Sequence, residues 1–189
     1  SAIGTFGGSL AEIEPAELAG QVMKAAVQRS GVDPKAINYV TVGNVIPTDT
    51  KDAYLARVAA IDAGCPIETP AFNVNRLCGS GLQAIISASQ AITLGDCEVA
   101  VGAGAESMSR GAYLLPQARW GARMGDSPML DYVVGALHDP FHKIHMGMTA
   151  ENVAEQYGIS RDQMDALAAE SHRRASAAIA AGHFKSQIV

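Results

Sequence analysis

The spacing of apolar residues predicts three helices in the first half of the chain. Leu18 and Val22 belong to a helical repeat that runs from Pro15 to Ser30 and ends before Gly31. A second helix is expected from Asp52 to Gly64, with Asp52 as its N-cap. A third is expected from Gly79 to Leu94.

Short runs of β-forming residues alternate with these helices. They are NYVTVGNVIP at 38–47, AFNVN at 71–75 and EVAVGAGAE at 98–106, and the last is expected to be a fully buried strand of small side chains. Strands and helices that alternate at this spacing indicate a parallel α/β sheet covered by helices. This α/β domain accounts for residues 1–107.

The periodic pattern is lost at 108–148, so we place a domain boundary before residue 108. A long irregular segment is more often functional than idle. A short helix is then expected at 149–158, with its threonine as the cap. Ser160 and Gln163 form a capping box that opens an alanine-rich helix reaching about residue 182.

Composition narrows the class of protein. Hydrophobic residues make up 48% of the 189 and charged residues only 17%, so we expect a globular chain whose surface is partly covered by partner subunits. The formal net charge of -5 argues against a nucleic-acid partner.

The three cysteines, Cys65, Cys78 and Cys97, contain no CxxC pair, so neither a disulfide framework nor a zinc ribbon is indicated. No uninterrupted apolar stretch approaches the ~18 residues of a spanning helix, and the first residues do not resemble a signal peptide. We therefore expect a cytoplasmic protein with no membrane partner. Both ends look cut, since the chain starts at Ser1 and stops on an apolar run.

Cys78 stands between a predicted strand and a predicted helix, and Gly79 and Gly81 follow it. The first helical turn favours a thiolate there, and the glycines leave room for a substrate carbonyl, with the Cys78 backbone N–H available to an oxyanion. A helix terminus contributes only about 0.3–1 kcal/mol at an exposed site, less than the ~1.4 kcal/mol of a tenfold change, so a base is also needed. On spacing alone, a cysteine buried in a glycine-rich turn stays an open alternative.

Three motifs break this tie. NRLCGSGLQAI around Cys78, GAGAESMSR at 102–110 and HMGMTAENVAEQYGISRDQMDALAAESHRRA from His145 resemble the thiolase family, above all its acetyl-CoA acetyltransferases and β-ketothiolases. The resemblance implies a thiolase fold: an α/β/α N-terminal domain at 1–107 that lacks its first strand, and a truncated, mostly helical loop domain at 108–189. The C-terminal thiolase domain is absent from this chain.

The resemblance also implies a reaction. Cys78 takes an acyl group from an acyl-CoA thioester, and the α-carbon of acetyl-CoA then attacks the acyl-enzyme; the reverse reaction cleaves a 3-oxoacyl-CoA. It places Leu137, His145 and Met146 along the pantetheine and acyl pocket. Coenzyme A is here a substrate and product, and no cofactor or metal is expected. The activating histidine and the second cysteine of thiolases lie in a C-terminal half, so the chain alone is expected to be inactive.

The irregular segment allows two further interpretations. His138, His142 and His145 suggest a zinc site, but Pro140 breaks their helical register and no fourth ligand is evident. Arg110, Arg119, Arg123 and Lys143 are either scattered solvated charges or a patch that attracts the CoA phosphates. The resemblance makes 109–126 the loop that joins two dimers into a homotetramer, with Trp120 as a possible anchor.

Other functions compete with an acyltransferase. VGAGAES after a strand resembles part of a dinucleotide-binding fingerprint, but Ser107 replaces its third glycine. Ketoacyl synthases also use a cysteine at a helix start, although the loop domain argues against them. A non-catalytic scaffold that binds acyl-CoA is the third alternative. Cys65 and Cys97 are expected to be structural, because Cys97 begins a strand and sites on parallel sheets form at strand ends.

Overall fold

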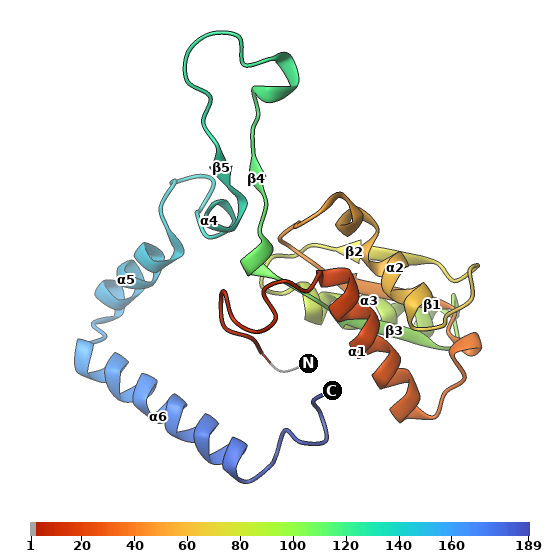
Figure 1. Cartoon of the computed structure of the whole chain (residues 1–189). Helices are drawn as coiled ribbons and strands as arrows, with labels where there is room; N and C mark the ends of the chain where they lie inside the picture. Colours follow the sequence, from red (N-terminus) through yellow and green to blue (C-terminus); the bar gives the residue numbers. More distant parts are fainter. Residues whose placement is uncertain (1–2) are drawn as a thin grey trace. The chain divides into compact units, whose positions relative to one another are not determined.

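A computed structural model describes residues 3–189 of the chain, which form two compact units, 3–135 and 136–189. Each unit is described by itself. The first unit holds a parallel sheet with its helices and a long ribbon, and the second consists of a tight turn and two helices (Figure 1).

The three helices expected in the first half are present, with some changes at their ends. The first unit contains, in order, α1 (Pro15–Ser30), β1 (Tyr39–Gly43), α2 (Leu55–Asp62), β2 (Ala71–Val74), α3 (Ser80–Leu94) and β3 (Ala100–Gly104). Short 3₁₀ helices at Pro34–Ala36, Thr50–Tyr54, Met108–Arg110 and Ala118–Trp120 connect these elements or lie in the ribbon. Gly31 and Gly95 end α1 and α3 in the left-handed conformation, as the sequence predicts.

The sheet has the order β2-β1-β3, and both pairs of neighbours are parallel. Gly43, the last residue of β1, pairs with Val74 on one side and with Gly104 on the other. The carboxyl ends of all three strands therefore lie in one row. The loops that follow them carry Cys78 after β2 and Glu106 after β3.

The two faces of β1 are covered by different helices. Val40 and Val42 are fully buried in a core that they form with residues of α1 and α2, whereas Gly43 approaches the backbone at the start of α3. Because successive side chains of a strand point to opposite faces, α3 covers the face away from α1 and α2. The core on the α1 and α2 side contains Ala16, Ala19, Met23, Val27, Ile37, Leu55, Ala56, Ala59, Ala60, Ala63 and Cys65.

Two details of the sequence prediction are wrong. Asp52 is not an N-cap: it is the third residue of a 3₁₀ helix whose N-cap is Asp49, and the two aspartates form a capping box. The strand β3 is only partly buried, because in the described chain it lies at the edge of the sheet. Its small side chains instead allow the close approach of α3.

The irregular segment has more order than its sequence suggests. β4 (Tyr113–Leu114) and β5 (Leu130–Asp131) form an antiparallel ribbon that extends away from the sheet, and α4 (Tyr132–Ala136) follows it (Figure 1). Ala112 donates to the carbonyl of Pro47 and the amide of Gly7 donates to Ser109. These bonds connect the ribbon to the first compact unit, which extends to residue 135.

The second unit contains α5 (Met146–Tyr157) and α6 (Arg161–Ala180). The capping box of Ser160 and Gln163 is confirmed at the start of α6. The cap expected at Thr149 is wrong, because α5 begins three residues earlier with His145 as its N-cap. No residue of α6 is buried within the described chain.

One segment of residues 3–189, Leu77–Leu94, has the length and composition of a membrane-crossing helix, with a mean hydropathy of 1.2. Polar residues interrupt it, so it is not a continuous apolar run. Its helical part, α3, packs against β1 and β3, and the core helix of a folded domain meets the same criteria. The length and composition of this segment are therefore only weak evidence for a membrane-spanning helix.

Candidate active site

Cys78 lies in a sharp turn between β2 and α3, one residue before the helix N-cap Gly79. Its thiol is free and its side chain is exposed. The structure thus removes the alternative of a cysteine buried in a glycine-rich turn. The Cys78 sulfur lies at the start of a helix and at the carboxyl edge of a parallel sheet. Enzyme nucleophiles are commonly found at this position.

The turn depends on an unusual backbone conformation at Leu77, whose φ of 48° lies in the left-handed region. This conformation is costly for a leucine, so neighbouring groups must hold it. The side chain of Asn75 accepts the Leu77 N–H at 3.0 Å. The buried hydroxyl of Ser80 accepts the Arg76 N–H at 2.8 Å and donates to the Leu77 carbonyl at 2.6 Å.

Two glycines of the sheet support the first turn of α3 from below. A Cβ atom on Gly43 would lie 2.7 Å from the carbonyl carbon of Ser80, and one on Gly104 would lie 3.4 Å from the Cα atom of Gly81. The first distance is shorter than any real contact, so the helix start and β1 meet backbone to backbone. This contact sets the distance between the start of α3, next to Cys78, and the sheet.

The other two cysteines are buried, as the sequence predicts. Burial raises the pKa of both thiols, and for Cys97 the neighbouring Asp96 adds to the effect. Cys97 also precedes β3, at the opposite end of the sheet from Cys78. Neither thiol is placed to react.

The sequence alone did not identify Asn75, Ser80 or Glu106 as parts of this site. Asn75 carries a local signal, since an asparagine side chain commonly accepts the N–H two residues on. Ser80 has the corresponding signal of a serine in the first turn of a helix. Glu106 has no local signal, because its partners lie about 60 residues away and depend on the pairing of β1 with β3.

In the second unit the structure brings together Leu137, His145 and Met146. The Met146 N–H donates to the Leu137 carbonyl at 2.8 Å, and a bridge between His138 and His145 closes the turn between them. All three of the predicted pocket residues are at least partly exposed. They form one small cluster at the start of α5.

His145 has a defined role in this cluster. Its Nδ1 atom accepts the Gly147 N–H at 2.9 Å and caps α5, so Nδ1 carries no proton and Nε2 carries the N–H of the neutral ring. The His138 ring packs edge-on at 5.2 Å. Within residues 3–189 no group of three or more His, Cys, Asp or Glu side chains is arranged to hold a metal.

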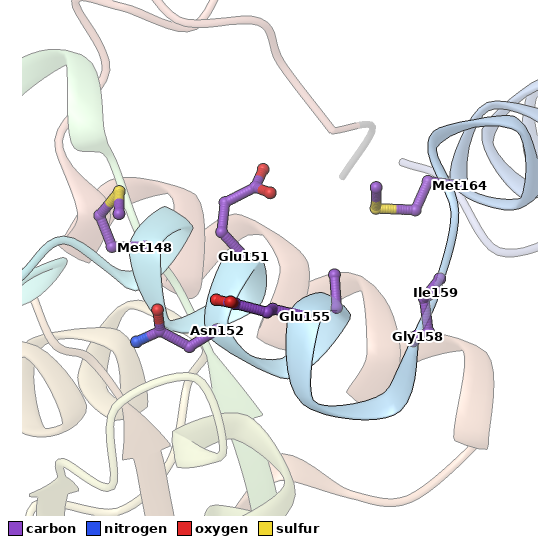
Figure 2. A pocket seen from close by; sticks show the side chains of 8 residues that line it. Met148, Glu151, Asn152, Glu155, Gly158, Ile159 and Met164 are labelled. Carbon is purple, nitrogen blue, oxygen red and sulfur yellow. The ribbon is translucent and has the colours of Figure 1, made fainter.

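Two shallow grooves lie where α5 meets α6. Figure 2 shows Glu151 and Glu155 on α5 and Met164 on α6 around one of them. The other, of about 650 Å³, is almost entirely apolar, and Met146 is one of the residues that line it. Its lining includes Thr149, Ala150, Val153, Ala154, Ile159, Gln163, Met164 and Leu167. No cysteine, serine or titratable side chain lines this apolar groove, so Cys78 remains the candidate for chemistry.

The ribbon carries exposed apolar and basic side chains. The side chain of Trp120 is 79% exposed, and Arg119 and Arg123 are exposed beside it. Arg110, by contrast, donates to the carbonyl of Glu12 and is partly buried. After β3 the chain forms a short 3₁₀ turn and not the helix whose N-terminus holds a pyrophosphate in dinucleotide-binding folds.

Comparison with known proteins identifies the family that has this fold. The family model of the thiolase N-terminal domain matches residues 1–189. The β-ketothiolase BktB of Cupriavidus necator is 62% identical over 189 residues, and an acetyl-CoA acetyltransferase of the same organism is 46% identical over 190. Both matches cover 100% of this chain and 48% of the relative, so the chain spans about half the length of these relatives.

Solved structures agree. The acetyl-CoA acetyltransferase of Bacillus anthracis superimposes with a TM-score of 0.95 at 46% identity, over 100% of this chain and 48% of that one. The human mitochondrial 3-ketoacyl-CoA thiolase in complex with CoA gives 0.93 at 38% identity, over 96% of this chain and 46% of that one. The expected fold class is confirmed, and the chain belongs to the thiolase family, whose N-terminal domain it contains.

Proposed function

We propose that the protein containing this chain is an acyl-CoA:acetyl-CoA C-acyltransferase and that Cys78 is its nucleophile. The observation that carries the proposal is the exposed thiol held in a constrained turn at the carboxyl edge of the sheet. The relatives support it, because their names describe acetyl-CoA acetyltransferases and a β-ketothiolase.

The proposed reaction has two steps. The Cys78 thiolate attacks the thioester carbonyl carbon of an acyl-CoA, the bond from that carbon to the CoA sulfur breaks, and CoA leaves as the thiol after taking up a proton. A base then removes an α-proton from acetyl-CoA, and the α-carbanion that forms attacks the carbonyl carbon of the acyl group on Cys78. The cysteine sulfur leaves, and 3-oxoacyl-CoA is formed. Reversal of these steps is thiolysis.

Electrostatics favour attack at this position. The first turn of α3 places partial positive charge near Cys78, and the proposed oxyanion site includes the Cys78 backbone N–H. A helix terminus supplies only about 0.3–1 kcal/mol, so a separate base must activate the thiol. We propose that this base and the group that removes the α-proton lie outside residues 1–189, and that the chain alone is inactive.

Leu137, His145 and Met146 are the proposed contacts of the pantetheine and acyl groups. They form one cluster, and the apolar groove that Met146 helps to line suits an acyl thioester. His145 contributes a hydrogen-bond donor through Nε2, because Nδ1 is occupied by the helix cap. Coenzyme A serves as substrate and product, and the proposal needs no cofactor or metal.

We further propose a cytoplasmic homotetramer that is assembled through the ribbon at 109–126. Trp120 and Met124 are exposed near the tip of that ribbon, and apolar side chains of this size are common anchors of interfaces. Replacement of Trp120 by alanine in the full-length protein should yield dimers in analytical ultracentrifugation. A tetramer of unchanged stability would contradict the anchoring role.

Mass spectrometry of the full-length protein after exposure to acetyl-CoA tests the main proposal. An acetyl group is expected on the peptide that contains Cys78, and none is expected in the Cys78→Ser variant. The Cys97→Ala variant is the matched control and should be acetylated like the wild type. Absence of the adduct from wild-type Cys78, or an unchanged turnover in Cys78→Ser, would refute the function.

A further inference from the structure

Glu106 is a half-buried carboxylate two residues beyond the end of β3. One oxygen accepts the Asn44 side-chain N–H at 2.9 Å and the Ile46 N–H at 2.8 Å, and the other accepts the Val45 N–H at 3.0 Å. None of the ion pairs found among residues 3–189 includes Glu106. Burial raises the pKa of its carboxyl group.

The three donors belong to the segment that follows β1, so Glu106 joins the ends of two neighbouring strands. The Asn44 side chain also donates to the Ala105 carbonyl at 3.0 Å, and the Ala105 N–H donates to Gly43 at 3.0 Å. On its other side, the Asn44 N–H donates to the Val74 carbonyl at 3.2 Å, which is the end of β2. Asn44 is thus held between all three strands.

The turn that carries Cys78 rests on these same strand ends. Val74 leads directly into Asn75, whose side chain holds Leu77 in its left-handed conformation. Gly43, next to Asn44, is in backbone contact with Ser80 just after the cysteine. A displacement of Asn44 would therefore be transmitted to the chain on both sides of Cys78.

We propose that Glu106 is a positioning residue, which places the Cys78 thiol for reaction by fixing Asn44 and the end of β1. This inference rests on the proposed function, in which the thiol is the nucleophile. Glu106 itself is not assigned a contact with the substrate. Its carboxylate suits the task, because the ionised group offers two acceptor oxygens and no donor to the three converging N–H groups.

The substitution Glu106→Gln tests this role in the full-length protein. The glutamine amide is nearly isosteric but turns one acceptor into a donor, which faces a backbone N–H. We expect kcat for acetoacetyl-CoA thiolysis to fall by roughly tenfold or more while KM changes by less than about twofold, since misplacement of a reacting atom acts on the transition state. Glu98→Gln is the matched control, because exposed Glu98 lies before β3, at the opposite end of the sheet; it should behave as the wild type.

The rate of Cys78 alkylation by iodoacetamide, measured below the unfolding temperature of each variant, provides a readout that does not need turnover. It should fall in Glu106→Gln and also in Asn44→Ala, which removes one of the three donors to Glu106 together with the bond to the Ala105 carbonyl. The second variant serves if the first does not fold. Wild-type alkylation and kcat in both folded variants would overturn the inference, and so would a fall in kcat with unchanged alkylation. A wild-type protein that takes no acetyl group would refute the proposed function, whereas the alkylation rates would still decide the positioning role.

Discussion

The hydroxyl oxygen of Ser80 lies 2.8 Å from the backbone nitrogen of Arg76 and accepts its hydrogen bond across the turn that contains Cys78. The same hydroxyl donates to the carbonyl of Leu77. One small side chain therefore satisfies two backbone groups on the approach to Cys78. It does so from a buried position, where water cannot replace it.

Replacement of Ser80 by alanine should destabilise the protein. The Arg76 N–H would lose its partner at a partly buried position, which costs about 0.5–1.5 kcal/mol. Urea unfolding of the full-length protein measures the loss. Ser89→Ala is the control, since the exposed Ser89 hydroxyl only bonds to a carbonyl of its own helix. Equal midpoints for the two variants would contradict the bracing role of Ser80.

Replacement of Gly43 by alanine should be more disruptive than replacement of Gly81. The new Cβ at Gly43 would meet the Ser80 carbonyl carbon at 2.7 Å, whereas a Cβ at Gly81 meets no atom within 4 Å. Overpacking against a backbone costs about 1–3 kcal/mol or more, while Gly81→Ala gains up to about 1 kcal/mol of helix propensity. Thermal unfolding of the two variants should shift in opposite directions, and a shared direction would refute the close contact.

The ribbon contains a pH-sensitive pair. A hydrogen bond to Asp131, helped by its negative charge, raises the pKa of Tyr113 above the ordinary 10.0. A raised folded-state pKa means that the pair stabilises the ribbon fully below the unfolded value, and that this contribution is lost as the pH rises through the folded value. Alkaline titration followed by tyrosine absorbance should show one late-titrating group.

Two variants identify that group among the five tyrosines. Tyr113→Phe should remove the late step, and Asp131→Asn should move it to lower pH, because the amide carries no charge. Tyr157→Phe, in the second unit, should leave the step in place. A late step that survives in Tyr113→Phe would show that Asp131 does not hold Tyr113 in solution.

The cap of α5 can be separated from the substrate role proposed for His145. Asparagine is a strong N-cap and keeps the acceptor, whereas alanine removes it at a cost of about 1 kcal/mol. His145→Asn should therefore unfold near the wild-type midpoint while its KM for acyl-CoA rises, since the Nε2 donor is lost. His145→Ala should show both defects.

His142 provides the control for this pair, because it lies in the same turn and is exposed. His142→Ala is expected to change neither stability nor KM. If His145→Ala were as stable as His145→Asn, the hydrogen bond from Gly147 would not be a significant cap. If KM were unchanged in both, the proposed substrate contact would be wrong.

Local signals in the sequence predicted some helix ends correctly and misplaced others. Pro15 and Gly31 bound α1 as expected, and Ser160 with Gln163 opens α6. The start of α5 was misplaced because threonine is a common cap and histidine is not. Asp49 and Asp52 have the same side chain, so composition could not decide which of them caps the helix.

The residues of the candidate site also differ in how well the sequence predicts them. The strand, the helix and the two glycines around Cys78 made it a candidate, and the resemblance of three motifs to the thiolase family made it the expected nucleophile. Asn44 and Glu106 were not identified, because their contact exists only once β1 and β3 pair in the observed register. No periodicity in a single sequence reports contacts between residues so far apart.

The hydrogen bond between Asn44 and Glu106 joins two residues that are synthesised at different times. The residues of β1 and of the turn with Cys78 are added to the chain before Glu106, so the nascent chain contains its proposed nucleophile before it contains the group that anchors it. At about 5–20 residues per second, this interval lasts on the order of seconds. During it, the cysteine belongs to an unfinished fold.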